Sequence, residues 1–194
     1  MGRVIVFSGH MIDNPAMRGP DKVRPARFPA QKTDAAAKAI GAALDRIGAA
    51  KGDLGLCSGA SGGDLLFAEA CLERGMRVEL RLARDETAFL TESVTFADPD
   101  HCWLNRFMRV KQNPDSKILI MPDELGPTPD GVSAHDRCNR WIFDAALSNG
   151  PSKLSAIVLW DGAPGDGPGG TRHMVELVRK HTGRAPEIID PAKL

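Results

Sequence analysis

The sequence predicts an α/β protein with a doubly wound, mostly parallel sheet of five to six strands between two layers of helices. Short apolar segments rich in β-branched residues alternate with longer helical segments along the whole chain. Two of the apolar segments lead into loops of small residues that open a helix. With 194 residues, the chain is expected to form a single domain, residues 1–194.

The predicted strands are short apolar runs, most of them continuous, as expected for strands that are buried on both faces. They comprise residues 3–7, 53–57, 76–82, 117–121, 154–160 and a short last strand at 187–189. The predicted helices comprise residues 34–50, a segment from the first glycine loop to Gly75, and residues 87–94, 102–111, 134–148 and 172–181. Thr33 and Thr171 are expected as N-caps. Residues 11–32 and 122–133 are expected as loops, the first of them unusually long.

Composition excludes several classes of function. The chain has 25 Lys and Arg against 25 Asp and Glu and no Tyr, so nucleic acid is not an expected partner. The four cysteines are scattered without ligand spacing, which favours free thiols in a reducing cytoplasm and predicts neither metal nor cofactor. The opening apolar run is too short for a signal peptide or a membrane span, so we expect a cytoplasmic protein.

The first small-residue loop, CSGASGGD, follows the second predicted strand. Its backbone N–H groups and the positive end of the next helix dipole suit an anion, above all a phosphate. The predicted ligand-binding residues of this loop are Ser58, Gly59, Ser61, Gly62 and Gly63. Asp64 falls in the first turn, where a carboxylate either complements the dipole or takes part in catalysis. A tight packing turn without a ligand is the alternative.

The second loop, DGAPGDGPGGT, lies between the fifth predicted strand and the last helix. Its glycines suit an anion-binding nest of backbone N–H groups, and its threonine offers a hydroxyl to a phosphate. The predicted ligand-binding residues are Asp161, as an acceptor for a ribose hydroxyl, and Gly167, Gly169, Gly170 and Thr171. A flexible surface loop is the alternative.

A third group of residues follows the first predicted strand, at the same carboxyl edge of the sheet. Ser8, Gly9 and His10 are expected near the ligand, because parallel α/β sheets bind ligands at this edge. The loop at 11–32 is basic in its middle, and Arg27 is expected to close over a phosphate. A solvated basic loop is the alternative.

The segment SGASGGDLLFAEACLERGMRVEL resembles the SLOG superfamily of Rossmann-like domains, and GDGPGGT resembles the PGGxGTxxE loop of its cytokinin-riboside phosphoribohydrolases, formerly misnamed lysine decarboxylases. FSGHMID and NRWIFDAAL are similar to segments of poorly characterised bacterial proteins of this group. The superfamily also includes the DNA-processing protein A family and nucleotide sensors of bacterial defence. The resemblance implies a Rossmann-like three-layer domain that binds a nucleotide and often forms a homodimer.

The residues favour binding over catalysis. In the phosphoribohydrolases a glutamate follows the threonine by three residues, whereas here Met174 stands at that position and Glu176 comes two residues later. We therefore expect a sensor, in signalling or defence, that binds a nucleotide or nucleotide-derived signal through the two loops. The alternative is a hydrolase that cleaves an N-glycosidic or phosphoribosyl bond, with Asp64 and Glu176 as catalytic residues. A third interpretation is an interaction module whose loops stay empty.

Overall fold

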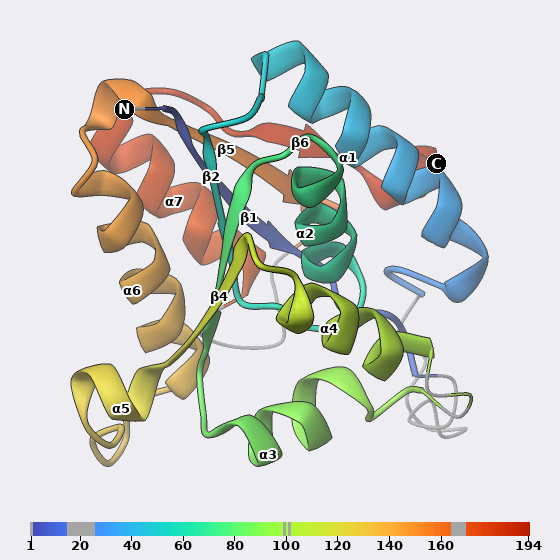
Figure 1. Ribbon diagram of the computed structural model, residues 1–194, viewed down its shortest axis with the longest axis vertical. Helices are drawn as coiled ribbons and strands as arrows, with labels where there is room; N and C mark the ends of the chain where they lie inside the picture. Colours follow the sequence, from blue (N-terminus) through green and yellow to red (C-terminus); the bar gives the residue numbers. More distant parts are fainter. Residues whose placement is uncertain (1, 15–25, 99, 101, 164–169) are drawn as a thin grey trace.

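Six parallel strands form one sheet at the centre of the molecule, in the order β4-β3-β2-β1-β5-β6 (Figure 1). The structure, a computed structural model, describes residues 2–14, 26–98, 100, 102–163 and 170–194. The strands are β1 (Val4–Gly9), β2 (Leu54–Cys57), β3 (Arg77–Leu82), β4 (Ser116–Ile120), β5 (Leu154–Leu159) and β6 (Glu187–Ile189). Every neighbouring pair is parallel, which confirms the predicted fold class.

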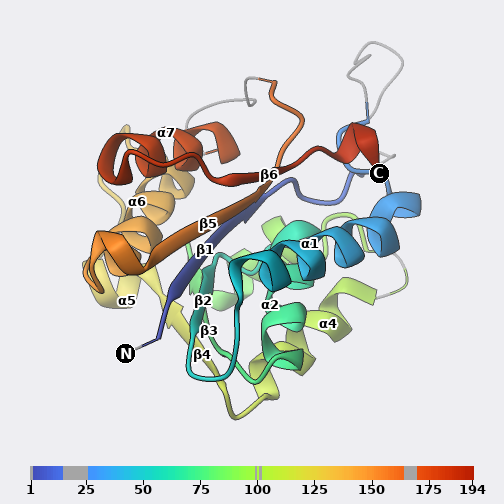
Figure 2. The same cartoon turned by 90° about the horizontal axis from the view of Figure 1, so that it is seen from above.

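Helices cover both faces of this sheet and give the three layers seen in Figure 2. One face carries α1 (Thr33–Ile47), α2 (Gly63–Glu73) and α4 (Cys102–Gln112), and the other carries α6 (Ala134–Leu147) and α7 (Thr171–Thr182). Shorter helical segments are η2 (Ala30–Lys32), α3 (Glu86–Phe89), η3 (Leu90–Val94), α5 (Met121–Leu125), η4 (Pro151–Lys153) and η5 (Pro191–Lys193). The chain moves outward from β1 to β4 and then returns to the other side of β1 for β5 and β6.

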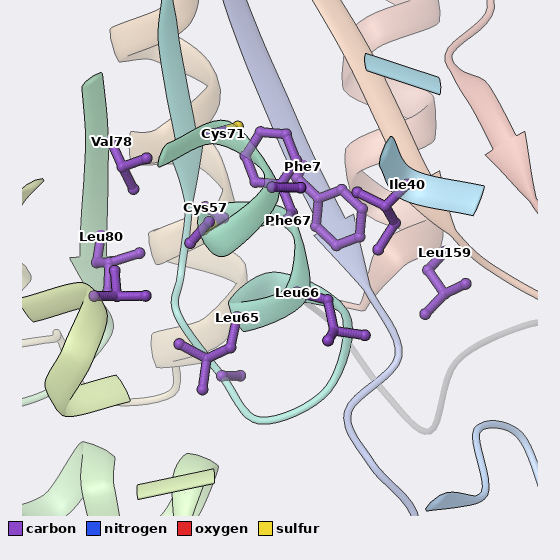
Figure 3. Packing of buried hydrophobic residues seen from close by; sticks show 14 of the residues in the cluster. Phe7, Ile40, Cys57, Leu65, Leu66, Phe67, Cys71, Val78, Leu80 and Leu159 are labelled. Carbon is purple, nitrogen blue, oxygen red and sulfur yellow. The ribbon is translucent and has the colours of Figure 1, made fainter. Parts of the chain in front are cut away.

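Strand β1 is buried on both faces, which explains its continuous apolar sequence. Ile5 and Phe7 belong to the core under α1, α2 and α4, whereas Val4 and Val6 belong to the core under α6 and α7. The ring of Phe7 stacks on that of Phe67 from α2, with centroids 4.9 Å apart (Figure 3). This packing fixes the start of α2 next to the carboxyl end of β1, where the candidate site lies.

The structure corrects three local predictions. The expected loop at 122–133 contains the end of α5, because the helix begins at Met121, which is buried, and Pro122 suits its first turn. Thr33 is not the N-cap of α1, since the turn η2 already leads into the helix and makes Lys32 the capping residue. The expected long loop at 11–32 includes η2 at its end, and its residues 15–25 lie outside the described ranges.

Candidate functional site

The strand order reverses between β1 and β5, and the carboxyl ends of these two strands form the candidate site. In doubly wound sheets this reversal opens a crevice beyond the strand ends, where ligands bind. The register pairs Gly9 of β1 with Leu159 of β5, and the N–H of His10 donates to the carbonyl of Leu159 at 3.0 Å. This pairing places His10, which follows β1, beside Asp161, which follows β5.

Three of the predicted site residues converge at this point. Nε2 of His10 lies 3.2 Å from Oδ1 of Asp161, and Nε of Arg27 donates to Oδ2 of the same carboxylate at 3.2 Å. His10 is buried, with 7% of its surface exposed, whereas the side chains of Asp161 and Arg27 are 21% and 25% exposed. The cluster therefore has a buried histidine behind a charged pair that reaches solvent.

His10 is held in the neutral form. Burial lowers its pKa below the ordinary value, and the positive charge of Arg27 lowers it further, against the opposing effect of Asp161. In the tautomer that carries its proton on Nδ1, Nε2 accepts the backbone N–H of Asp161 at 3.2 Å, although the same nitrogen also lies 3.2 Å from Oδ1 of that residue. The proton of the neutral ring is then on Nδ1, which has no hydrogen-bond partner among the described residues. His10 can donate this proton to a ligand.

Asp161 is held as a carboxylate. Its partial burial disfavours ionisation, but the hydrogen bonds from Arg27 and from the N–H of Ala163, with the positive charge of Arg27, outweigh that effect. The pKa of Asp161 therefore lies below its usual value. An ionised oxygen at the end of β5 suits the hydroxyl groups of a sugar, as the sequence predicts.

Arg27 owes its position to Asp13, a residue that sequence reasoning did not select. The carboxylate of Asp13 accepts from the N–H of Phe28 at 2.9 Å, and its own N–H donates to the carbonyl of Phe28. Phe28 is completely buried in the core. The signal in the sequence was present, because Asp13 is an acidic residue close behind β1 in an otherwise basic segment.

The start of α7 is the second part of the site. Thr171 is the first residue of this helix rather than its cap, because Gly170, in an extended conformation, is the N-cap and no side chain caps it. This corrects the prediction of Thr171 as a capping residue. The threonine is 8% exposed, and its hydroxyl has no hydrogen-bond partner in the part of the chain that is described. Gly167 and Gly169, also predicted here, lie outside the described residues.

The loop between β2 and α2 is built differently from the prediction. The N–H groups of Ser58 and Gly59 donate to Oδ2 of Asp64, each at 3.1 Å, and the hydroxyl of Ser58 donates to the same oxygen. The donors that were expected to bind a phosphate thus bind a carboxylate from the first turn of α2. Asp64 is buried, at 4% exposure, and burial raises its pKa to about 6 against the opposing hydrogen bonds.

The rest of this loop is covered by the chain itself. Gly62 forms a bridge with Met11, the N–H of Gly63 donates to the carbonyl of His10 at 3.1 Å, and Ser61 accepts from the N–H of Ile12 at 3.2 Å. A Cβ on Gly62 would lie 2.7 Å from the nitrogen of Ile12, so only glycine fits. The segment after β1 therefore lies directly on the start of α2.

The remaining predicted residues are not brought together. Ser8 and Gly9 form the end of β1, so they lie at the candidate site through their backbone. Glu176 pairs with Arg172 on the surface of α7, where both side chains are 58% exposed. Asp64 starts α2 on the other face of the sheet. The two predicted catalytic carboxylates thus belong to opposite helical layers.

The cysteines take no part in the site. All four are free thiols, of which Cys57, Cys71 and Cys138 are buried and Cys102 is exposed. Within the described ranges, three or more His, Cys, Asp or Glu residues are nowhere grouped so that they could hold a metal ion. Nor does any helix in those ranges combine the length and apolar character needed to cross a membrane.

Comparisons with known proteins add little to this picture. No protein-family model matches the chain, and no curated protein matches it. Among solved structures, the chain is similar to the X-ray structure of TM1055, a target of the Northeast Structural Genomics Consortium. The two share 14% sequence identity over 92% of this chain and 69% of the other, with a TM-score of 0.44. The fold class stated above rests on the sheet topology of this chain itself.

Proposed function

We propose that this protein binds a nucleotide or a nucleotide-derived signal at the carboxyl ends of β1 and β5. The observation that carries the proposal is the convergence of His10, Arg27 and Asp161 at the point where the strand order reverses. A cation, a neutral hydrogen-bond donor and a carboxylate acceptor together suit a ligand that has both a phosphate and a sugar. The resemblance of the loop sequences to the SLOG superfamily supports the same ligand class.

The phosphate is assigned to the start of α7. The helix has 12 residues, and no side chain caps its N-terminus. The hydroxyl of Thr171, a residue that is 8% exposed, is a further donor at that end. Arg27 adds a positive charge nearby, where it pairs with Asp161 at the end of β5. The sugar is then assigned to Asp161, as acceptor, and to Nδ1 of His10, as donor.

Binding of nucleoside mono- and diphosphates, dinucleotides and cyclic dinucleotides tests this proposal, with thermal shift for screening and calorimetry for affinity. We expect Arg27→Gln and Thr171→Val to weaken a ligand found in this way by about tenfold each, since each removes one hydrogen bond to a charged group. Arg46→Gln is the matched control, because Arg46, near the end of α1, forms a surface pair with Glu187 at the start of β6 and touches none of the site residues. Absence of binding by every phosphorylated nucleoside to folded protein would contradict the proposal.

Hydrolysis of an N-glycosidic bond is the second candidate function. It is favoured by Asp161, an ionised and partly exposed carboxylate that can stabilise positive charge on a ribose. Asp64 and Glu176, the predicted catalytic pair, lie in different layers, so Asp161→Asn is the decisive variant. Release of free base from a nucleoside monophosphate by the native protein, lost in Asp161→Asn with binding retained, supports this function. Binding without release of base supports a sensor.

We further propose that the chain is a SLOG member that acts in the cytoplasm as a homodimer. The support is the resemblance of its two loops and its free, mostly buried cysteines. Light scattering coupled to size-exclusion chromatography, with and without the ligand, measures the oligomeric state. A monomer under both conditions would contradict the homodimer. An interaction module with empty loops predicts instead no binding in the nucleotide screen.

A further inference from the structure

We propose that Asp64 is a specificity-determining residue, whose carboxylate permanently occupies the β2–α2 loop so that the ligand site accepts a single anionic group. The inference rests on the proposed function, because it concerns the same nucleotide site. The sequence of the β2–α2 loop predicts that it binds a phosphate, but in this inference the loop excludes a second phosphate. The expected ligand is then a nucleotide of which the protein binds one phosphate. It is not a nucleotide whose phosphates are held by both loops.

The first step concerns the donors of the loop. Two successive N–H groups, those of Ser58 and Gly59, and the hydroxyl of Ser58 all donate to Oδ2 of Asp64. The N–H of Ala60 also interacts with this carboxyl group. Successive N–H groups that point at one oxygen form a nest for an anion. In this chain the anion in the nest is a side chain, so a phosphate would have to displace it.

The second step concerns access to the loop. Asp64 is 4% exposed, and the loop residues Gly59 and Ser61 are buried as well. The N–H of Ser61 donates to the carbonyl of Ser93 at 2.8 Å, and that of Gly63 donates to the carbonyl of His10. Five N–H groups of the loop, those of Ser58, Gly59, Ala60, Ser61 and Gly63, thus have partners within the protein. Displacement of Asp64 would leave a buried carboxylate without its donors, which is costly.

The start of α7 presents the contrasting arrangement. Gly170 is the N-cap of this helix, and no side-chain hydrogen bond caps it. Among the described residues two acidic side chains lie near that end of the helix: Asp161 accepts from Arg27 and Ala163, and Asp136 pairs with His173 in the first turn of α7. No described carboxylate therefore accepts from the backbone N–H groups at the start of α7, whereas at α2 the carboxylate of Asp64 occupies the N–H groups of Ser58 and Gly59.

Crystals of the native chain soaked in selenate, a tetrahedral anion with anomalous scattering, test the inference directly. We expect no anomalous peak within hydrogen-bond distance of the N–H groups of Ser58 and Gly59. In Asp64→Ala crystals we expect a peak there, because the nest is vacated. Asp34→Ala is the matched control, since it removes an exposed first-turn carboxylate from α1, which has no such nest. A loop peak in native crystals, or none in Asp64→Ala crystals, overturns the inference.

Solution binding of the native protein supplies a second test that needs no variant. If one phosphate is bound, adenosine monophosphate and adenosine diphosphate should differ in affinity by less than about tenfold. A gain of a hundredfold or more for the diphosphate overturns the inference, because such a gain requires a second phosphate site. If neither these two nucleotides nor any other in the screen binds, the proposed function is contradicted. A selenate peak in the β2–α2 loop of the native protein overturns only the inference about Asp64.

Discussion

The guanidinium of Arg27 donates its Nε–H to Oδ2 of Asp161 at 3.2 Å, across 134 positions of the sequence. Behind this pair, the ring of His10 receives the backbone N–H of Asp161. The sheet register and the Asp13–Phe28 hydrogen bonds together produce this arrangement. Through this arrangement the charge of Arg27 affects the pKa of His10. Both residues are far from Asp161 in the sequence.

Replacement of Arg27 by Gln should raise the pKa of His10. Arg27 is the largest contributor after burial to the lowered pKa of this ring, and the carboxylate of Asp161 then acts without opposition. An NMR titration of the imidazole Cε1–H resonance measures the change. Arg46→Gln serves as the control and should leave the titration unaltered. An unchanged His10 titration in Arg27→Gln would show that burial alone sets the pKa.

The stability of the protein should fall with rising pH in the range where Asp64 ionises. The pKa of Asp64 is raised from 3.8 to about 6 in the folded state, so the fold is favoured while this group is protonated. This contribution is complete below pH 3.8 and is lost as the pH rises through about 6. Relative to Asp64→Asn, the free energy of unfolding of the native protein should fall by about 3 kcal/mol between pH 3.8 and about 6. At higher pH it should fall no further relative to that variant.

Urea denaturation of both proteins at closely spaced pH values measures this difference. Asp34→Asn, which alters an exposed carboxylate in the first turn of α1, controls for general effects of charge. A difference between native protein and Asp64→Asn that stays constant from pH 4 to 7 would mean that Asp64 ionises normally.

Replacement of Gly62 by Ala should destabilise the fold strongly. The residue has φ 95° and ψ −130°, a conformation that side chains rarely adopt, and a Cβ would lie 2.8 Å from the carbonyl oxygen of His10. We expect the free energy of unfolding of Gly62→Ala to be lower than that of the native protein by more than about 2 kcal/mol. Gly131→Ala is matched, because Gly131 also has a positive φ but its Cβ would meet open space. It should cost about 1 kcal/mol. Equal losses in thermal or urea unfolding would show that the contact with His10 is unimportant.

Replacement of Ser61 by Ala should leave stability unchanged or raise it by about 1 kcal/mol. The hydroxyl of Ser61 is buried without a hydrogen-bond partner among the described residues, and such a group costs free energy. Ser58→Ala provides the comparison, because it removes a hydroxyl that donates to Asp64, and it should cost about 1 kcal/mol. A larger loss for Ser61 than for Ser58 would contradict this ranking.

Much of the fold follows from local sequence patterns. All six strands and the longer helices were predicted within a few residues, because apolar runs, helical periodicity and glycine stops are local signals. The errors also have local causes. Thr33 has the chemistry of a cap, but a preceding turn makes it an interior residue of the helical segment. The sequence pattern places Met121 at the end of a strand, because a buried apolar residue fits either element.

The sequence by itself determined the alternation of strands and helices, and hence the edge at which His10, Asp161 and the β2–α2 loop gather. Only the tertiary structure decided the strand order, which makes β1 and β5 neighbours and pairs Asp161 with Arg27. It also decided that the β2–α2 loop binds Asp64 and is covered by Met11. The physical reason is that the sequence of a loop determines which N–H and hydroxyl donors it has, whereas the packing of distant segments determines which acceptor reaches these donors.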